Sequence, residues 1–181
     1  MRIVKILALV VFSLLFAFSS SADTTVNATK VRVLFTPGDN VAASITQAIR
    51  NAKQSVHVQA FNFTNKAIAR ALQDASQRSI DVKVLADREQ FEKGAGFLLR
   101  DLKQAGVNVM LDGEHAAAHN KVMLIDADGA NPIVVTGSFN FTQAAQKYNA
   151  ENVVLIYDDR TVAKAYLENW QRHWQHGINF E

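Results

Sequence analysis

Two hydrophobic periodicities alternate along the chain after about residue 30, and this alternation most constrains the fold. Short apolar runs of strand length are separated by longer segments in which apolar residues recur every three or four positions. The pattern is typical of an α/β domain. Strands are expected at 31–35, 55–63, 80–86, 107–111, 121–125, 133–136 and 151–157, and helices at 40–53, from 65 onward, at 89–105 and at 159–176.

Residues with cap or turn preferences separate these segments. Asn40 and Asn65 stand where helix N-caps are expected, and Gly106 stands where a helix C-cap glycine belongs. The sequence DADGANP, residues 126–132, is rich in turn formers and predicts a hairpin with a long loop. No linker, low-complexity tract or internal repeat follows the N-terminal segment, so residues 23–181 are expected to form one domain.

The N-terminal segment has the features of a secretory signal peptide. Arg2 and Lys5 precede an apolar stretch, residues 6–18, that ends in small residues. This stretch is shorter than the roughly 20 residues that a membrane-spanning helix needs. Cleavage after Ala22 would leave 181 − 22 = 159 residues. We therefore predict a signal peptide at 1–22 and an exported protein, periplasmic or secreted, with a retained membrane anchor as the alternative.

Composition excludes some chemistry and leaves the partner open. Removal of residues 1–22 takes away two basic residues, so 19 − 2 = 17 basic residues remain beside 17 acidic ones. Overall charge therefore does not indicate a nucleic-acid partner, and attraction to phosphate must come from local arrangement. The chain has no cysteine, which excludes disulfides, thiolate nucleophiles and cysteine-zinc sites.

The polar residues that indicate chemistry lie between residues 118 and 142. Strand side chains alternate between faces, so His119 and Lys121 lie on one side at the beginning of their strand. Ser138 and Asn140 share a side just beyond the end of the next strand. Pairing of these strands as a hairpin would bring an imidazole, an ammonium, a hydroxyl and a carboxamide together.

Such a set fits the chemistry of a phosphodiester. An imidazole can attack phosphorus or move a proton near neutral pH, and the other groups can hold the non-bridging oxygens. Glu151, at the start of the next strand, is placed to hydrogen-bond and orient an imidazole. Asp126 has the opposite parity and is expected to be structural, as an anchor of the hairpin. A His-x-Lys pair alone is equally consistent with a solvated strand end.

The order of these residues adds a family resemblance. The string HNKVMLID has the form H-x-K-x4-D, and GSFN follows it. Together they resemble the phospholipase D superfamily, and the chain is most similar to the small exported bacterial endonucleases that carry one copy of the motif. Ten residues, 127–136, separate Asp126 from Gly137, where the family usually has fewer. The extra residues are expected in the 126–132 turn, because long surface insertions cost little.

The resemblance implies a mixed β-sheet sandwiched between helices and a two-step reaction without metal or other cofactor. One histidine forms a phosphohistidine, while a second protonates the leaving oxygen and then activates water. Because the chain has one H-x-K motif, a homodimer is implied in which His119 of both subunits faces a shared site. A monomer that uses His57 or His115 as the acid is the alternative. The implied catalytic residues are His119, Lys121, Ser138, Asn140 and Glu151, with Asp126 and Gly137 as structural members of the motif.

The other ring-bearing residues have structural interpretations. His57 is expected on a strand under a helix, and His115, His173 and His176 at the surface. The stripe Tyr166, Trp170 and Trp174 has the spacing of a helix face packed in a core or dimer, with base stacking as the alternative. No carboxylate spacing resembles a two-metal nuclease site, so no metal is predicted.

Three functions are consistent with the sequence. The leading hypothesis is a non-specific endonuclease that cleaves DNA or RNA. The alternative is a phospholipase D that hydrolyses phosphatidyl headgroups with the same residues, although no basic amphipathic helix for lipid docking is evident. A phosphate-binding module without activity is the third, and the complete set of polar residues argues against it.

Overall fold

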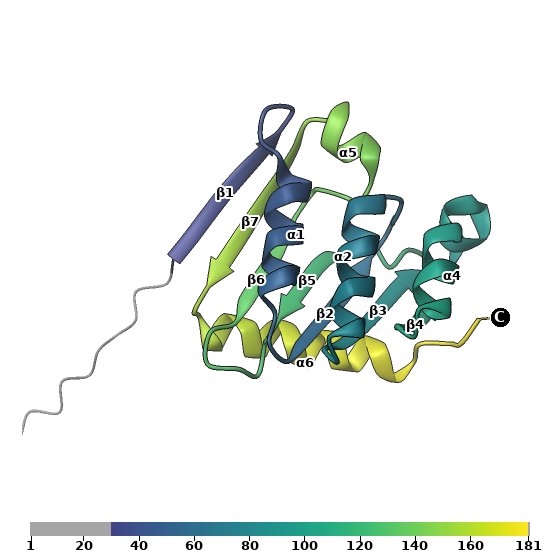
Figure 1. The fold of residues 1–181 in the computed structure, drawn as a ribbon. Coiled ribbons are helices and arrows are strands. Elements are labelled where there is room, and N and C mark those ends of the chain that lie inside the picture. The colour runs from purple at the N-terminus through teal and green to yellow at the C-terminus, as the bar shows by residue number, and fades with distance from the viewer. Residues whose placement is uncertain (1–29, 181) are drawn as a thin grey trace, which may run out of the picture.

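The fold is a seven-stranded mixed sheet with helices on both faces (Figure 1). The computed structural model describes residues 30–180, so the predicted signal peptide lies outside the described residues. The strand order is β1-β7-β6-β5-β2-β3-β4, in which β2, β3 and β4 are parallel and the other pairings are antiparallel. The strands are β1 (Lys30–Thr36), β2 (Ser55–Ala60), β3 (Asp81–Asp87), β4 (Asn108–Asp112), β5 (Lys121–Ile125), β6 (Ile133–Gly137) and β7 (Glu151–Tyr157).

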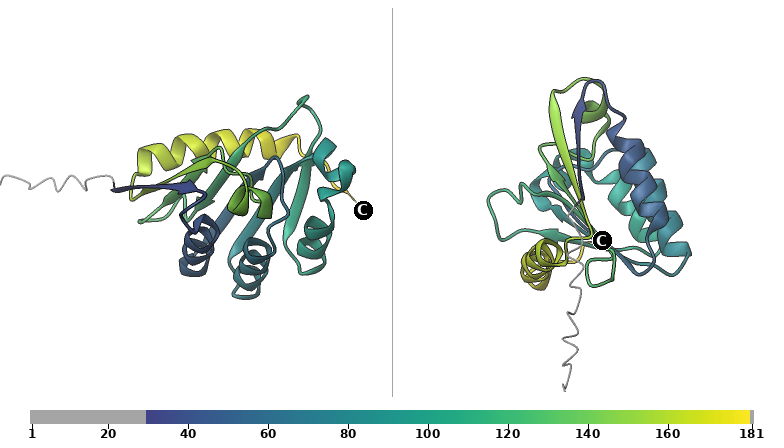
Figure 2. Two further views of the ribbon diagram at one scale, coloured as in Figure 1. Left: turned by 90° about the horizontal axis from the view of Figure 1, so that it is seen from above. Right: turned by 90° about the vertical axis from the view of Figure 1, so that its left-hand side faces the viewer.

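The helices form the two outer layers, as expected for an α/β sandwich. Figure 2 shows α1, α2 and α4 on one face of the sheet and α6 alone on the other. Within residues 30–180, no helix has both the length and the apolar character needed to cross a membrane. The helical segments are α1 (Val41–Asn51), α2 (Lys66–Gln77), α3 (Arg88–Gln90), the π-helical η1 (Phe91–Ala95), α4 (Phe97–Gln104), α5 (Gln143–Lys147) and α6 (Arg160–Gln175).

Local signals in the sequence account for several helix ends. The Asn40 side chain accepts a hydrogen bond from the Ala43 N–H and so caps α1, and Asn65 caps α2 in the same way. Gly106 follows α4 with a φ of 86°, a conformation that L side chains rarely adopt. These three predicted caps are confirmed.

Alternate side chains of the central strands fill two cores. On the α1/α2/α4 face, Met123 and Ile125 of β5 pack with the helix residues, and on the α6 face Val122 and Leu124 pack against α6. All five residues of β5 are buried. The central strand that follows His119 is therefore fixed from both sides.

The prediction of a single helix at 89–105 was wrong. The chain instead forms three segments, because Gly94 has a φ of 109° and interrupts the helix. A Cβ on Gly96 would stand 2.7 Å from the Phe91 ring, so that glycine lets the ring pack into the core. Phe97, the first residue of α4, is 46% exposed. The short α5 was also not predicted.

The register brings the predicted site residues to one end of the sheet. Lys121 is opposite Ala60, Gly137 is opposite Val153, and Glu151 is opposite Thr36. We call this the polar end: β2, β3 and β4 finish here, and β5 and β7 begin here. The long turn 126–132 lies at the opposite end of the β5–β6 hairpin, so its extra residues leave the polar end unchanged.

Candidate active site

The polar end contains two hydrogen-bonded groups built from the predicted residues. His119 and Lys121 form one at the start of β5, and Ser138 and Glu151 form the other between β6 and β7. Because β5, β6 and β7 are neighbours in the sheet, the hairpin pairing that the sequence predicted places the two groups side by side. The negative charge of Glu151 acts to raise the pKa of Lys121, so the two groups interact electrostatically.

His119 and Lys121 share a hydrogen bond beside an aromatic ring. The Lys121 Nζ lies 2.8 Å from His119 Nδ1 and donates to the His119 carbonyl oxygen at 2.7 Å. The His119 ring packs on Phe61 with centroids 4.3 Å apart, and Lys121 Nζ lies 4.8 Å from the same ring centroid. The imidazole is exposed while Lys121 is only 7% exposed. A reachable imidazole is thus held against a buried ammonium, an arrangement that can receive an anion.

The environment of Lys121 changes its proton affinity. Burial lowers the pKa of the Lys121 ammonium, because the charged form loses hydration, and the negative charge of Glu151 opposes this effect. The charge of an incoming phosphate would act in the same direction as Glu151. An anionic substrate bound here would therefore stabilise the charged form of the partly desolvated Lys121 side chain.

Glu151 does not contact an imidazole of its own chain as the sequence predicted. Its Oε2 accepts a hydrogen bond from the Ser138 hydroxyl at 2.6 Å, and its Oε1 accepts one from the Asn149 amide at 3.0 Å. The Ser138 oxygen in turn accepts from the Asn152 backbone N–H at 3.1 Å. The predicted Glu151–imidazole hydrogen bond was therefore wrong for this arrangement, in which Glu151 orients a serine.

Asn140 brings an unsatisfied polar atom to the same end. Its Oδ1 is buried and has no hydrogen-bond partner among residues 30–180, as is also true of Asn62 Oδ1. A buried amide oxygen without a partner is costly, and each such group needs an explanation. The backbone of Asn140 is fixed by a hydrogen bond from the Thr142 N–H to its carbonyl oxygen. The Asn140 Oδ1 can therefore accept a further hydrogen bond at this end of the sheet.

The two remaining motif residues hold backbone in place. Gly137 has a φ of 150°, and a Cβ there would stand 2.2 Å from the Asn152 carbonyl oxygen, so no other residue fits. The Asp126 carboxylate accepts hydrogen bonds from the backbone N–H groups of residues 53, 54 and 55, at distances between 2.7 and 3.2 Å. It ties the end of β5 to the start of β2, and lies at the opposite end of the sheet from His119.

Phe61 packs against His119 and Lys121, and sequence reasoning did not predict it as a site residue. It follows β2 and is joined to the His119 segment by a hydrogen bond from its N–H to the Asn120 carbonyl oxygen. A large apolar residue just after a strand that ends at the polar end was the available signal. Periodicity alone did not distinguish it from ordinary core.

The stripe on α6 is core packing. Trp170 is 2% exposed, donates its indole N–H to the Val58 carbonyl oxygen and stacks on Trp174 at 4.9 Å. His57 lies under α6 as predicted, with its ring stacked on Trp170 at 4.4 Å and a hydrogen bond to Asp81. Burial lowers the pKa of His57, against the opposing influence of Asp81. The buried face of Trp170 leaves no platform for base stacking.

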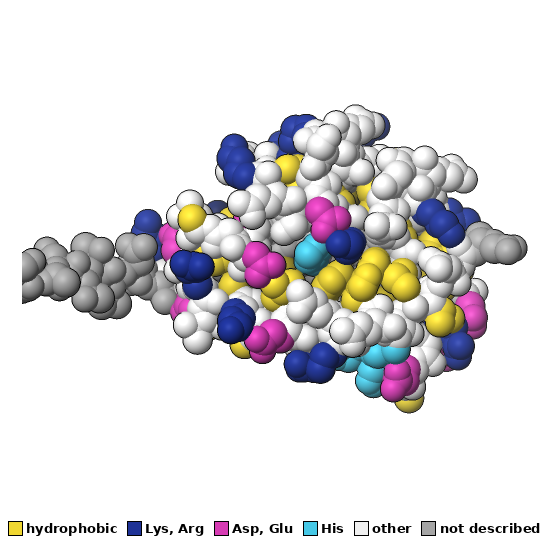
Figure 3. Space-filling view, turned by 90° about the horizontal axis from the view of Figure 1, so that it is seen from below, with side chains coloured by type: hydrophobic (Ala, Val, Ile, Leu, Met, Phe, Trp, Pro, Cys, Tyr) yellow, Lys and Arg dark blue, Asp and Glu magenta, His cyan; other side chains and the backbone are white. Residues whose placement is uncertain are grey.

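The other three histidines are gathered rather than scattered. His115, His173 and His176 surround Asp112 at the end of β4, with their Nδ1 atoms within 3.1 to 3.8 Å of its oxygens. Figure 3 shows histidine side chains gathered on one face of the molecule. His173 and His176 are at the surface as predicted but only partly exposed, with side chains 20% and 26% exposed. The available signal was the spacing of three residues in both Asp112–His115 and His173–His176.

Comparison with known proteins identifies the family. The family model described as "Cardiolipin synthase, PLD-like domain" matches residues 45–174. The chain therefore belongs to the phospholipase D superfamily of phosphodiesterases, as its H-x-K-x4-D motif, mixed sheet and polar end indicate.

Particular relatives extend this result. The chain is 41% identical over 140 residues to a protein named Phospholipase D from Rickettsia typhi, and 31% identical over 137 residues to Mitochondrial cardiolipin hydrolase of Xenopus tropicalis. Those matches cover 77% and 76% of this chain, and span 66% and 62% of the relatives' own lengths. Among solved structures, the phospholipase D family member Nuc from Salmonella typhimurium matches with a TM-score of 0.78 and 31% identity, over 84% of this chain and 99% of that chain. NucT from Helicobacter pylori shares the fold, with a TM-score of 0.75 and 23% identity over 84% of this chain and 99% of that chain.

Proposed function

We propose that this chain is an exported, metal-independent endonuclease that cleaves nucleic acid through a phosphohistidine, as a homodimer with a shared site. One observation carries the proposal: an exposed imidazole is hydrogen-bonded to a buried ammonium at the start of β5, and Asn140 follows the neighbouring strand β6 at the same end of the sheet. A nucleophile, a cation and a neutral hydrogen-bonding group are what transfer of a phosphoryl group to an enzyme requires.

The proposed reaction has two steps. His119, in the tautomer that carries its proton on Nδ1 and no longer accepts from Lys121, attacks the phosphorus through Nε2 and forms a P–N bond, while the P–O bond to the leaving sugar oxygen breaks and that oxygen takes a proton from a second imidazole. The Lys121 ammonium and the Asn140 side-chain N–H hold the non-bridging oxygens as their charge increases. The second imidazole then takes a proton from water, which attacks the phosphohistidine and releases the phosphate ester and His119.

The second imidazole is proposed to be His119 of another subunit. His57 is stacked beneath α6 on Trp170, and His115 is held at Asp112, so each is occupied elsewhere. Lys121 and Asp112 lie on β5 and β4, which are three strand spacings apart in the sheet, or about 14 Å. A two-fold axis beside the polar end would bring two copies of His119 to one phosphate.

An exposed apolar strip on β1 supports the dimer. Val31, Val33 and Phe35, which we call the β1 strip, are 56%, 49% and 57% exposed on the outermost strand of the sheet. Exposed apolar residues gathered in this way are typical of protein interfaces. The strip ends beside the site, because Phe35 is opposite Asn152, whose backbone N–H donates to Ser138.

A cationic groove favours nucleic acid over lipid. Arg50, Lys66 and Arg70 line a groove of about 370 Å³ between α1 and α2, with only Thr46, Ala67 and Ala71 as further lining residues. The helix α2 starts near the site, because Asn65, its N-cap, donates its backbone N–H to the Phe141 carbonyl oxygen. A polymer presents further phosphates to such cations, whereas a single headgroup does not reach them. The relatives named for phospholipase D and cardiolipin hydrolase make a lipid the second candidate substrate.

The test compares substrates and variants under matched conditions. Hydrolysis of single-stranded DNA, duplex DNA, RNA and phosphatidylcholine or cardiolipin vesicles is measured for the wild type, for His119→Ala, and for a variant with Arg50, Lys66 and Arg70 all replaced by alanine. We expect cleavage of nucleic acid, loss of it in His119→Ala, and a raised KM with unchanged kcat in the groove variant. Cleavage of vesicles alone would assign the site to lipid. Full activity of His119→Ala would contradict the mechanism.

The metal-free step needs a separate control. The same assay is run in excess EDTA, and circular dichroism shows whether the chain stays folded. Activity that persists in EDTA supports attack by histidine alone. Loss of activity in EDTA from a chain that remains folded contradicts it if His173→Ala, a change outside the site of His119 and Lys121, keeps its activity without chelator.

A further inference from the structure

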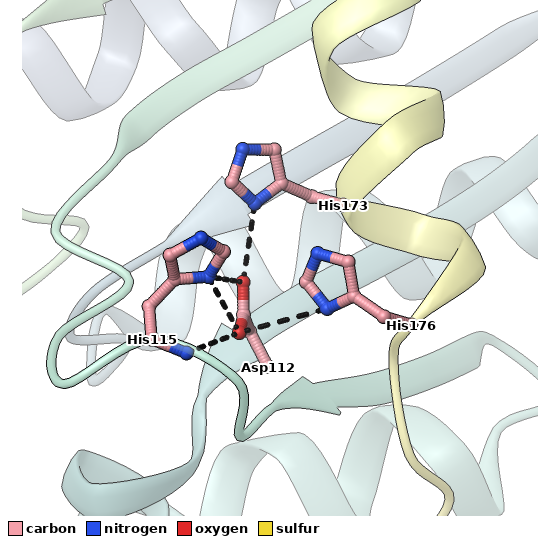
Figure 4. Close-up of side chains that lie close together, drawn as sticks. All are labelled: Asp112, His115, His173 and His176. Atoms are coloured by element: carbon pink, nitrogen blue, oxygen red, sulfur yellow. Dashed lines mark hydrogen bonds and ion pairs between the residues drawn. The ribbon is translucent and has the colours of Figure 1, made fainter.

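Four side chains from distant parts of the chain converge near the last turn of α6. Asp112 ends β4, His115 lies in the loop that follows, and His173 and His176 lie at the end of α6 (Figure 4). One possible ligand atom from each residue lies within 4.8 Å of the others. In Figure 4 the three imidazoles surround the Asp112 carboxylate. We call these residues the Asp112 cluster.

The centre of the cluster is a fully buried carboxylate. The Asp112 side chain is 0% exposed, and its oxygens lie 3.1 Å from His115 Nδ1 and 3.2 Å from His173 Nδ1. Its Oδ1 also accepts hydrogen bonds from the backbone N–H groups of Glu114 and His115, which fix the carboxylate in the turn after β4. A buried carboxylate needs a charged or metal partner, because burial without one is costly.

His176 provides the second observation. Its Nδ1 is buried and has no hydrogen-bond partner among the described residues, although it lies 3.8 Å from Asp112 Oδ1 and 3.3 Å from Glu114 Oε2. A buried ring nitrogen without a hydrogen bond is destabilising. It is, however, the state that a metal ligand requires, because a neutral imidazole binds metal through an unprotonated nitrogen.

We propose that the Asp112 cluster binds one zinc ion. Three imidazole nitrogens and one carboxylate oxygen make a four-ligand set of the type that holds zinc in a tetrahedral site. Nitrogen-rich sets disfavour calcium and magnesium, which prefer oxygen ligands. Tetrahedral ligands at about 2.1 Å from the metal lie about 3.4 Å apart, so the site closes on the ion by movement of side chains alone. Glu114, whose Oε2 lies 3.3 Å from His176 Nδ1, adds negative charge beside the proposed cation.

The proposed role of the ion is structural. It would join the loop 113–120 to the end of α6, and this loop also carries His119 at its far end. The loop has a second attachment, the hydrogen bond from the Ala118 N–H to Asp87 Oδ2 at 2.8 Å. Four protein ligands fill a tetrahedral site and leave no position for substrate, which is the pattern of structural zinc. Zinc here would stabilise the segment that presents the nucleophile, while the phosphodiester chemistry proceeds about 14 Å away without it.

The test measures metal binding rather than activity. The full chain without a histidine tag is stripped with EDTA, checked by circular dichroism and titrated with zinc alone, and bound zinc is counted by mass spectrometry of the metal. We expect one zinc per chain and, when cobalt replaces zinc, the strong visible absorption of a tetrahedral site. His173→Ala and His176→Asn are expected to weaken zinc binding by more than about 100-fold.

His119→Ala is the matched control, because it removes a histidine of the same loop outside the Asp112 cluster. It is expected to lose hydrolysis and keep full zinc binding, so failure of the proposed nuclease and failure of the proposed zinc site give different results. Less than a tenth of an equivalent of zinc on the folded wild type would overturn the site. Equal zinc binding by His173→Ala and the wild type would also overturn the proposed zinc site. If His173→Ala does not fold, the cobalt spectrum of the wild type decides alone.

Discussion

The two histidine groups of this chain differ in whether one subunit completes them. At the start of β5, the exposed imidazole of His119 contacts the buried ammonium of Lys121, while the Glu151 carboxylate is already hydrogen-bonded to serine. At the Asp112 cluster, three imidazoles enclose one buried carboxylate from the same chain. The first group has spare hydrogen-bonding capacity, and we propose that a second subunit and a substrate complete it. The second is nearly closed, and one ion would complete it. The exposure of the side chains and the partners that they still lack therefore distinguish a reactive site from a structural site more clearly than residue type does.

The largest expected effect is removal of the imidazole of the H-x-K motif. Replacement of His119 by alanine should lower kcat/KM by more than about 10⁴-fold, because the same substitution removes the nucleophile and the acid of a symmetric dimer. The melting temperature should hardly change, since the side chain is exposed. Steady-state hydrolysis of a chromogenic phosphodiester measures the rate, and trapping with labelled substrate detects the phosphohistidine. Label retained by the alanine variant would contradict this assignment.

The second prediction tests the need for another subunit. Phe35→Arg should break the proposed dimer at the β1 strip and lower kcat by about 10² to 10⁴-fold, the usual contribution of a general acid, because each monomer would keep only its own imidazole. Sedimentation velocity gives the oligomeric state. Phe97→Arg is the matched control, because this phenylalanine is similarly exposed on α4, far from β1 in the sheet order. A fully active monomeric Phe35→Arg would rule out the shared site.

The third prediction concerns the buried cation of the polar end. Lys121→Ala should lower kcat by about 10² to 10³-fold, because the developing negative charge on phosphate loses its closest ammonium. Lys147→Ala serves as control, since this lysine is exposed on α5 and outside the hydrogen-bonded groups. Single-turnover rates on DNA separate this effect from binding. If only KM rises while kcat is unchanged, Lys121 binds substrate without stabilising the transition state.

The fourth prediction concerns the stability that zinc bound at the Asp112 cluster would add. With free zinc at 100 times its dissociation constant, the wild type should gain about 2.7 kcal/mol, which corresponds to a rise in melting temperature of about 5 to 10 °C. His173→Ala should show no such rise, while His119→Ala should match the wild type. Differential scanning calorimetry with and without zinc provides the measurement. An equal rise in all three proteins would place the bound zinc elsewhere.

The two groups also differ in how far sequence could predict them. The caps Asn40 and Asn65 and the hydrogen bond between His119 and Lys121 depend on near neighbours in the chain, and the structure has them as expected, whereas the strand predicted at 55–63 ends at Ala60. The Asp112 cluster depends on contacts between residues 61 positions apart, Asp112 and His173, which periodicity does not register. Glu151 was misassigned for a related reason. Both a serine and an imidazole were within reach by strand register, and the conformation of the 138–150 loop determined the partner.

The smallest expected effect lies at His57, the histidine that belongs to neither group. Burial against Trp170 lowers the pKa of His57, although Asp81 opposes this, while Lys83 acts with burial and the more distant Asp128 acts with Asp81. The unfolded chain therefore binds the proton more tightly than the folded chain. The stability due to neutral His57 is fully present above the unfolded pKa of about 6.5 and is lost as the pH falls through the lower folded pKa.

His57→Phe tests this assignment, because it keeps a ring against Trp170 and removes the titration. Urea unfolding is measured at a series of pH values from 7.5 downward, and the difference between variant and wild type cancels the other four histidines. The wild type should lose stability more steeply than the variant below pH 6.5. Parallel curves would show that protonation of His57 costs nothing in the folded chain, and that its stacking under α6 accommodates the imidazolium as readily as the neutral ring.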